Sequence, residues 1–566
     1  MKTKIQIFSI LFVFLVACNN NPNSEQKETP VSKFPNFIVI VADDLGYSDL
    51  GAFGGEINTP VLNALAKEGI QFTNFHVLPT CSPTRSSLMS GNDNHVAGLG
   101  VMSETIYPAI KDLPGYAGHL SKQVATLPEV LATGGYNTYM SGKWHLGETD
   151  DQSPFARGFQ ETFSFAEGAA SHWSDMRALG AETSVTYRRN GMPVATLPED
   201  FYSTKNYTDS IIHFIDKNKT DEKPFLAYLS FTAPHDPLHA PAEYIAKYKG
   251  RYDQGWDELR NERVKGLLEK GIISEDVAQE ELSQNVMVQP WATLDEQSKK
   301  EKTRDMEVYA AMVDYIDASV GRLTDYLKAN NLYDNTIILF FSDNGANGAP
   351  ATAYPGNADG QYLSTFNNEL ENRGLPNSFI DMGAGWAQAS SANFRLFKSF
   401  TSEGGIKSPL IVKPLSKSAK QGLNTSLLHV SDIMPTLLDY AGIAYPKEVN
   451  GTPVKTPIGE SFKTVLNGGE THKQRNKGIG YELFEMKAYI EGDWKILRLV
   501  APFGNGDWQL YNLAEDPSEL NDLSATNPEK RMELIDAYQA YAKENEVFDH
   551  QGLFDGFFKQ AYGVDE

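Results

Sequence analysis

Asn36-Phe-Ile-Val-Ile-Val41 is a β-branched apolar run that passes directly into Ala42-Asp43-Asp44-Leu45-Gly46. An unbroken run of this kind is typical of a strand buried on both faces of a parallel sheet. Residues 336–341 form a second such run, and Ser342-Asp343-Asn344-Gly345 follows it. Ligands of open α/β sheets bind just beyond the carboxyl ends of the strands, so both endings are expected at one rim of one sheet.

The polar residues at these strand ends predict a metal site. Asp43 and Asp44 are adjacent carboxylates that repel each other unless a cation lies between them. Together with Asp343 and Asn344 they offer four oxygen donors, which suit Ca²⁺ better than Mg²⁺. The alternative is that Asp-Asp and Asp-Asn-Gly are only turn formers after strands, and these two motifs alone leave it open.

The segments between and around these strands alternate between helix and strand. Thr59 and Pro60 are a helix start signal. The pattern predicts a doubly wound α/β lobe. Its further elements are helices at 59–66, 121–132 and 304–330 and strands at 136–140 and 224–231.

Two insertions and a second lobe complete the predicted organisation. Residues 251–303 are charged and helix-like, and we expect a solvated excursion that carries no chemistry. Residues 350–394 are rich in Gly, Ala, Asn and Ser and are expected to form a loop at the rim of the site. The chain then changes to short antiparallel strands and a helix near 527–544. The predicted strands are 478–484, 487–490, 494–499 and 508–511.

The N-terminus has the features of an export signal. Lys2 and Lys4 precede an apolar run at 5–17, which is too short to span a bilayer comfortably. The run ends in Leu15-Val16-Ala17-Cys18, which resembles a bacterial lipobox. We therefore expect a lipoprotein signal peptide at 1–17, a lipid anchor on Cys18 and a polar tether at 18–33. A simple signal peptide with an incidental Cys is the alternative.

Composition and charge restrict the function. The 566 residues are 41% hydrophobic and 22% charged, which argues against disorder and against a multispan membrane protein. The net charge of −23 weighs against nucleic acid as a partner, because phosphate backbones need a basic surface. An anionic substrate would need a local cluster of Lys, Arg and His.

The chain has two cysteines, Cys18 and Cys81. If Cys18 is lipidated, Cys81 has no disulfide partner, and an odd Cys in an exported protein calls for a chemical reason. Cys81 opens Cys81-Ser82-Pro83-Thr84-Arg85. The alternative is a free buried thiol beside a proline turn.

Basic and imidazole side chains follow other predicted strands. Lys143 and His145 stand two residues apart in Gly-Lys-Trp-His-Leu-Gly, and His235 follows the strand at 224–231. Lys398 lies in a later loop. A single His or Lys in a loop is more often structural than catalytic, but here several strand-to-loop junctions each deliver one.

The order of these motifs resembles that of the type I, formylglycine-dependent sulfatases, and of bacterial arylsulfatases in particular. The similarity spans nearly the whole chain through VADDLGYSDLGAFGG, CSPTRSSLMSG, GKWHLG, FTAPHDPL, FFSDNG, WAQASSANFRLFKSFTSEGGIKSPLIV and HVSDIMPTLLDYAGI. It implies an α/β, alkaline-phosphatase-like fold: a large mixed, mostly parallel sheet flanked by helices, with a smaller C-terminal antiparallel sheet-plus-helix lobe. The implied domains are a catalytic domain at 34–474 and a C-terminal subdomain at 475–566.

The resemblance also implies a nucleophile and a metal. Cys81 would be oxidised by a maturation enzyme to Cα-formylglycine (3-oxoalanine), whose hydrate attacks sulfur. Asp43, Asp44, Asp343 and Asn344 would hold one Ca²⁺ that also contacts the residue made from Cys81. Asp343 would help to deprotonate the attacking hydroxyl.

Five further residues receive catalytic roles by the same resemblance. Arg85 would neutralise and orient the nucleophile, and Lys143 would bind sulfate oxygens. His235 and Lys398 would also bind sulfate and would be candidates for the general acid at the leaving oxygen. His145 would contact the second hydroxyl of the hydrate and take its proton, because imidazole titrates near neutrality.

The implied reaction is hydrolysis of aryl or alkyl sulfates, with sulfated glycan fragments as a further substrate class. A phosphonate monoester or phosphodiester hydrolase of the same superfamily is the enzymatic alternative. A surface lipoprotein that binds sulfated glycans without catalysis is the other, although every expected catalytic position is filled. Asp236, after His235, stands where relatives often have an apolar or aromatic residue, and this difference would alter the pocket beside the leaving group. The expected location is the periplasmic side or the surface of the outer membrane.

Overall fold

The computed structural model describes residues 34–180, 184–279, 285–415, 419–470 and 475–548, and its centre is one large mixed sheet. The strand order is β10-β2-β9-β8-β1-β7-β3-β4-β5-β6, with β11 paired to β2. Strands β8, β1, β7, β3 and β4 run parallel, whereas β9 is antiparallel to both of its neighbours. The strands are β1 (Asn36–Ala42), β2 (Ile70–His76), β3 (Asn137–Lys143), β4 (Glu161–Phe165), β5 (Tyr187–Arg189), β6 (Met192–Pro193), β7 (Phe225–Ser230), β8 (Thr336–Ser342), β9 (Lys407–Lys413), β10 (Gly422–Asn424) and β11 (Leu428–His429).

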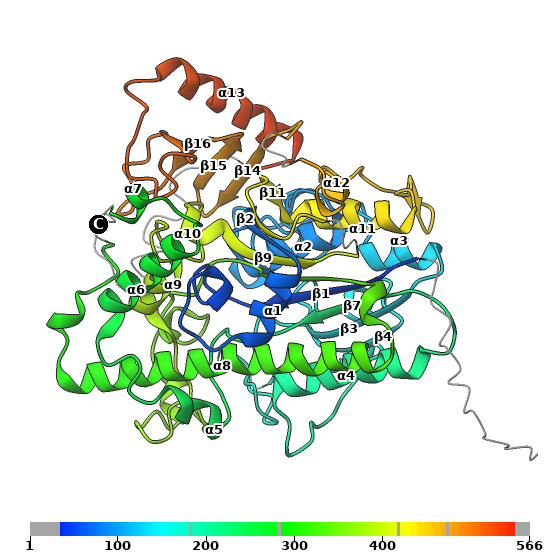
Figure 1. Cartoon of the computed structure of the whole chain (residues 1–566), viewed down its shortest axis with the longest axis horizontal. Coiled ribbons are helices and arrows are strands. Elements are labelled where there is room, and N and C mark those ends of the chain that lie inside the picture. Colours follow the sequence, from blue (N-terminus) through cyan, green and yellow to red (C-terminus); the bar gives the residue numbers. More distant parts are fainter. Residues whose placement is uncertain (1–33, 181–183, 280–284, 416–418, 471–474, 549–566) are drawn as a thin grey trace, which may run out of the picture.

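Helices cover both faces of this sheet, as Figure 1 shows for α8 and α4 on one side and α2, α3 and α11 on the other. The principal helices are α1 (Pro60–Glu68), α2 (Cys81–Ser90), α3 (Leu127–Thr133), α4 (Ser203–Asn218), α5 (Ala242–Ile245), α6 (Gly255–Glu269), α7 (Glu275–Ala278), α8 (Glu296–Ala329), α9 (Gly383–Ser391), α10 (Glu403–Ile406), α11 (Ile433–Ala441) and α12 (Lys463–Leu466).

The strand at the middle of the sheet shows why its sequence is apolar at every position. Ile38 and Ile40 of β1 belong to the core that contains Val313 of α8. Phe37 and Val39 belong to a second core, on the α2, α3 and α11 side. Successive side chains of a strand point to opposite faces, so a strand between two helical layers needs apolar residues throughout.

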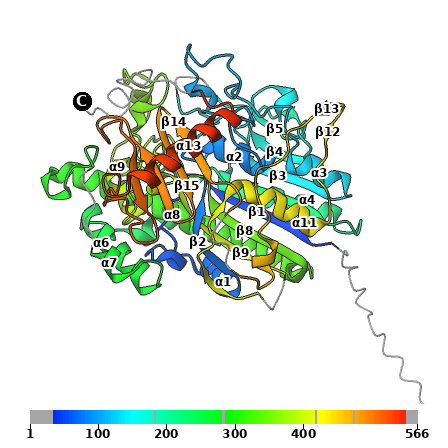
Figure 2. The ribbon, with the colours of Figure 1, turned by 90° about the horizontal axis from the view of Figure 1, so that it is seen from above.

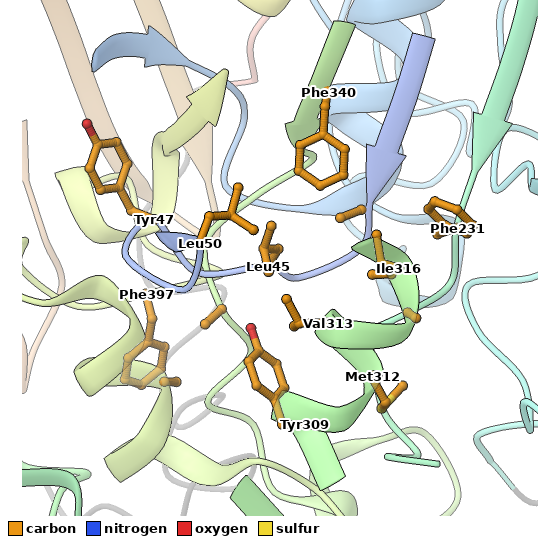
Figure 3. Close-up of a cluster of buried hydrophobic side chains, with 14 of the residues drawn as sticks. Leu45, Tyr47, Leu50, Phe231, Tyr309, Met312, Val313, Ile316, Phe340 and Phe397 are labelled. Carbon is orange, nitrogen blue, oxygen red and sulfur yellow. The ribbon is translucent and has the colours of Figure 1, made fainter. Parts of the chain in front are cut away.

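The α8 side of the core continues beneath the strand ends. Figure 3 shows Leu45 and Leu50 of the loop after β1 beside Tyr309 and Val313 of α8. All four are at most 1% exposed. The loop that carries Asp43 and Asp44 therefore packs against a buried hydrophobic layer.

The C-terminal part contains a four-stranded antiparallel sheet and one long helix. Its strands are β14 (Ile479–Leu483), β15 (Met486–Glu491), β16 (Trp494–Arg498) and β17 (Gln509–Asn512), and α13 (Pro528–Glu544) lies across them (Figure 2). A separate two-stranded ribbon joins β12 (Glu448–Val449) to β13 (Thr452–Pro453). The predicted α/β class, mixed sheet and small C-terminal lobe are confirmed. The domain limits 34–474 and 475–566 stay predictions.

Three sequence-based expectations were wrong in detail. The helix predicted at 121–132 begins at Leu127, because Thr126 and Glu129 form a capping box and Pro128 occupies the first turn. The strand predicted at 136–140 continues to Lys143. The long helix begins at Glu296 rather than at residue 304. Asp295 caps this start, because its side chain accepts hydrogen bonds from the backbone N–H groups of Gln297 and Ser298.

The segment at 251–303 is helical at α6 and has many exposed residues, but it is not solvated throughout. Trp256 and Trp291 are 7% and 8% exposed and contact Trp386 through their rings. Arg263 of α6 is fully buried and reaches the loop after β1. Of the helix predicted at 276–282, the structure shows α7 (Glu275–Ala278), and residues 280–282 lie outside the described residues. The predicted rim loop at 350–394 includes α9.

The predicted signal peptide at 1–17, the lipid anchor on Cys18 and the tether at 18–33 lie outside the described residues. Among the helices that the structure does describe, none has the length and the apolar composition of a membrane span.

Candidate active site

Four adjacent strands end at one rim and deliver most of the predicted residues. In the sheet register, Ala42 of β1 pairs with Ser342 of β8, and Val41 pairs with Ser230 of β7. Gly142 of β3 also pairs with Ser230. The strands therefore end at one level, and the residues that follow them meet there, as the sequence predicts.

Cys81 is the first residue of α2 and points at the acidic pair. Its Sγ lies 3.3 Å from Oδ1 of Asp43 and 3.8 Å from Oδ1 of Asp44. Arg85 follows one turn later, so it shares a helix face with Cys81. Burial raises the pKa of the Cys81 thiol well above its ordinary value. The side chain is therefore a neutral thiol and a poor nucleophile.

Three buried cations form ion pairs with three buried carboxylates: Lys143 with Asp43, Arg85 with Asp343, and Lys398 with Asp44. The Nζ of Lys143 lies 2.8 Å from Asp43 Oδ2, and Arg85 Nη2 lies 2.7 Å from Asp343 Oδ2. Although burial favours the neutral acid, Lys143 and Arg85 hold the pKa of Asp43 far below its usual range. Burial and the neighbouring Asp43 instead raise the pKa of Asp343 to about 6.

Arg85 is fixed by several acceptors. Its Nε lies 2.9 Å from Asp343 Oδ2, and its Nη1 donates to the carbonyl of Lys143 at 3.2 Å and to the Ser230 hydroxyl. A fully buried guanidinium held in this way keeps one orientation.

His235 and Lys398 form a pair on the other side of the acidic residues. Lys398 Nζ lies 3.2 Å from His235 Nε2 and 2.9 Å from Asp44 Oδ2. Burial lowers the pKa of His235 to about 4, despite the attraction of Asp44. Although burial opposes it, Asp44 raises the pKa of Lys398. The pair thus combines a charged ammonium with a neutral imidazole near pH 7.

His145 lies at the edge of this cluster, just after the end of β3. Its backbone has a positive φ of 55°. Its Nε2 lies 3.2 Å from Oε2 of Glu104. Burial lowers the pKa of His145 although Glu104 acts in the opposite direction, so the ring is neutral at pH 7.

The donors fit a hard cation. Asp43, Asp44, Cys81 and His235 present ligand atoms that lie within 4.8 Å of one another. The Oδ1 of Asn344 is buried and has no hydrogen-bond partner among the described residues, while its Nδ2 donates to Asp44 at 2.6 Å. Carboxylate and amide oxygens are ligands that Ca²⁺ accepts. The sulfur of Cys81 is the donor that a hard cation disfavours.

Sequence reasoning missed several residues that hold this site. Ser230 and Glu104 stand in no motif that signals a role. Tyr354 and Asn347 donate to Asp236 Oδ2 at 2.8 and 2.9 Å, and burial raises the pKa of Asp236 well above its usual value. Of these residues, only Asp236 was recognisable in the sequence, because relatives often have another type of residue after the histidine.

Comparison with known proteins identifies the family. The model of the Sulfatase family matches residues 35–443, and that of the N-sulphoglucosamine sulphohydrolase C-terminal region matches residues 393–547. An uncharacterized sulfatase of Schizosaccharomyces pombe is 41% identical over 91% of this chain and 95% of its own length. An arylsulfatase of Klebsiella aerogenes is 38% identical over 76% of this chain and 92% of its own.

Solved structures share the fold. Ps i-CgsB, crystallised with k-i-k-neocarrahexaose, superposes with a TM-score of 0.64 at 23% identity, covering 94% of this chain and 98% of its own. A protein crystallised with its substrate D-glucosamine-2-N,6-O-disulfate gives a TM-score of 0.60 at 20% identity, with 91% of this chain and 99% of that chain covered. The chain therefore belongs to the sulfatase family and is a sulfuric ester hydrolase.

Proposed function

We propose that this sulfatase uses a formylglycine made from Cys81 and one Ca²⁺ to transfer the sulfuryl group of its substrate. The observation that carries the proposal is the position of Cys81 Sγ, 3.3 Å from Asp43 and 3.8 Å from Asp44, in a buried cluster that also holds three cations. These contacts support an oxygen-bearing residue at position 81 better than a thiol.

Two properties of Cys81 argue that the thiol is a precursor. Burial raises its pKa, which removes the thiolate that a cysteine nucleophile needs. Its neighbours Asp43 and Asp44 are hard ligands suited to a cation that prefers oxygen. Oxidation to an aldehyde that hydrates replaces the sulfur by oxygens and removes both conflicts.

Asp43, Asp44, Asp343 and Asn344 would hold the Ca²⁺, as the unpartnered Oδ1 of Asn344 supports. When bound, the ion supplies positive charge beside the transferring group and the attacking oxygen. It would also take over the neutralisation of the carboxylates that Lys143 and Lys398 provide in this structure.

The remaining cations fit an anionic sulfuryl group. Lys143, Lys398 and Arg85 are fixed before substrate arrives, and a sulfuryl group in transfer carries negative charge spread over its oxygens. We assign sulfate binding to Lys143, Lys398 and His235. Release of the lysines from Asp43 and Asp44 would free them for this role.

The leaving oxygen needs a proton donor, and the pair of Lys398 and His235 is suited to supply one. The charged Nζ of Lys398 lies 3.2 Å from His235 Nε2, so a proton can pass between them. General acid catalysis of this kind contributes typically ~10²–10⁴-fold. We assign the general acid to this pair.

We propose that the leaving group is an aromatic alcohol or a saccharide hydroxyl. The relative in Klebsiella aerogenes is an arylsulfatase, and two fold neighbours were crystallised with saccharides. Likeness of fold alone does not fix a substrate. Competition between 4-nitrophenyl sulfate and sulfated oligosaccharides would rank the two classes.

Three measurements test the proposal. Mass spectrometry of the tryptic peptide that contains position 81 should find the aldehyde in protein made with a maturation enzyme. The variant C81S should lose multiple turnover, since a serine sulfate ester cannot expel its sulfate in the same way. Full turnover by C81S would overturn the mechanism. A higher catalytic efficiency on 4-nitrophenyl phosphonate esters than on 4-nitrophenyl sulfate would favour the phosphonate alternative.

We further propose that the protein is an exported lipoprotein, anchored to the outer membrane through Cys18. The lipobox-like residues 15–18 and the polar residues after them support this location. Metabolic labelling with a fatty-acid analogue should mark the wild type and C81S but not C18S. Equal labelling of C18S would refute the anchor.

A further inference from the structure

We propose that Glu104 is a positioning residue for His145: it holds the ring with its proton on Nε2 and leaves Nδ1 as the nitrogen that accepts a proton at the reaction centre. The inference rests on the proposed function for the role of that proton transfer. It assigns to Glu104 a part that no motif of the sequence indicates.

The geometry joins two distant loops. Glu104 belongs to the short 3₁₀ helix η2 (Ser103–Thr105), and its Oε2 lies 3.2 Å from His145 Nε2 across 41 positions of sequence. The His145 side chain is 4% exposed and that of Glu104 is 36% exposed. Ser103 Oγ also donates to Glu104 Oε2, at 3.2 Å. The carboxylate therefore lies between solvent and the buried ring.

The charge of Glu104 decides which ring nitrogen carries the proton. Although burial opposes it, His145 lowers the pKa of Glu104 to about 2, so the carboxylate is ionised and can only accept hydrogen bonds. His145 Nε2 must then be the donor. A neutral imidazole protonated at Nε2 has its lone pair on Nδ1.

The second ring nitrogen is free for chemistry. His145 Nδ1 is buried, and no described residue hydrogen-bonds to it. Lys143 and Arg85 both lower the pKa of this ring, so the ring lies within electrostatic reach of two cations of the site. A buried imidazole nitrogen without a protein partner is suited to a partner on the reacting group. When Nδ1 takes a proton, the carboxylate of Glu104 stabilises the imidazolium, as a carboxylate does in hydrolase triads.

Gly168 leaves the space that this pair needs. A Cβ at Gly168 would lie 3.1 Å from Glu104 Oε1 and 3.1 Å from both Cε1 and Nε2 of His145. An added methyl group would therefore press on both partners at once. The substitution G168A disturbs the geometry of the pair without changing its charge.

A purely structural ion pair is the alternative, and the tautomer separates the two. In deuterated protein with ¹⁵N-labelled histidine, His145 of the wild type should show an Nε2-protonated neutral ring, assigned by loss of its signals in H145Q. In E104Q the glutamine amide can donate as well as accept, so the ring should become a mixture of tautomers. The matched control E148Q, at an exposed glutamate three residues after His145, should leave the ring unchanged. An Nδ1-protonated wild type, or an unchanged ring in E104Q, overturns the inference.

Kinetics with 4-nitrophenyl sulfate provide a second readout. E104Q should release one equivalent of nitrophenol in a burst at nearly wild-type rate, and its steady-state kcat should fall by roughly 10–100-fold with little change in KM. E104D should recover part of kcat, and G168A should behave like E104Q. A parallel loss of burst and steady state would indicate a structural role and overturn the inference. A wild type that turns over no sulfate ester would instead refute the proposed function, while the tautomer measurement would still stand.

Discussion

The Nη1 of Arg263 lies 2.5 Å from Oδ1 of Asp49, and both side chains are fully buried. Arg263 comes from α6, within the insertion at 251–303, whereas Asp49 lies in the loop after β1. The other carboxylate oxygen of Asp49 accepts from the backbone N–H of Gly46 at 2.7 Å and from the Tyr309 hydroxyl at 2.6 Å. The insertion therefore braces the loop that carries Asp43 and Asp44.

Replacing Arg263 by Met should destabilise the protein strongly. Glu56 and Asp49 would both remain buried without their cation, and breaking a buried ion pair from one side costs about 3–5 kcal/mol. Urea unfolding of R263M should show a lower midpoint. The same change at Lys265, whose side chain is 75% exposed on the same helix, should have little effect. Equal midpoints for R263M and K265M would show that the buried pair does not support the fold.

The sequence predicted the parts of the fold and site that follow local rules. Asn36–Ala42 and Thr336–Ser342 are recognisable because a strand between two helical layers is apolar at every position. Predicted metal ligands directly after two such strands must share a rim once the strands are parallel neighbours. The candidate catalytic residues of the other loops were predicted from family motifs.

What escaped prediction depends on contacts between distant segments. Arg263 sits in a charged, helix-like segment that resembles a solvated one, since its partners Asp49 and Glu56 lie about two hundred positions earlier. Glu104 likewise meets His145 only because the chain folds back. The predicted start of α3 was wrong for a local reason, because the capping box of Thr126 and Glu129 starts the helix at Leu127.

Ca²⁺ should stabilise the protein, and Asp43 should be needed for that gain. A ligand at 100 times its Kd adds about 2.7 kcal/mol to the free energy of unfolding. Thermal unfolding of the wild type should therefore shift upward when Ca²⁺ is added to chelator-treated protein. D43N should lose this shift, whereas D325N, at an exposed site on α8, should keep it. A full Ca²⁺ shift in D43N would place the ion elsewhere.

The C-terminal sheet should be required for a stable catalytic part. Lys495 of β16 lies 2.9 Å from Glu403, close in sequence to Lys398, and 2.6 Å from Glu519, and all three of these charged side chains are fully buried. K495M would leave two buried carboxylates without this cation and should lower the unfolding midpoint as R263M does.

A surface pair in the same subdomain provides the control for K495M. Lys477 and Glu544 are each 60% exposed, so K477M should leave the midpoint nearly unchanged. Equal unfolding midpoints for K495M and K477M would show that the buried cluster around Lys495 does not support the contact between the C-terminal sheet and the catalytic part.

Stability should fall in acid partly because of His172. The ring is buried, its Nδ1 lies 2.7 Å from Ser203 Oγ and its Nε2 lies 3.1 Å from the carbonyl of His235. Burial lowers the pKa of His172 to about 3, whereas an unfolded histidine has a pKa of ~6.5. Between these pKa values the unfolded chain binds the extra proton. The contribution of neutral His172 to the free energy of unfolding is therefore present above pH ~6.5 and is lost as the pH falls toward ~3.

The variant H172Q tests this contribution. It keeps a donor for the carbonyl of His235 and should flatten the pH dependence of the free energy of unfolding between these pH values by up to about 1.4 kcal/mol per pH unit. H213Q, at an exposed histidine of α4, should leave the slope as in the wild type. An unchanged slope in H172Q would mean that His172 is protonated equally in the folded and unfolded states.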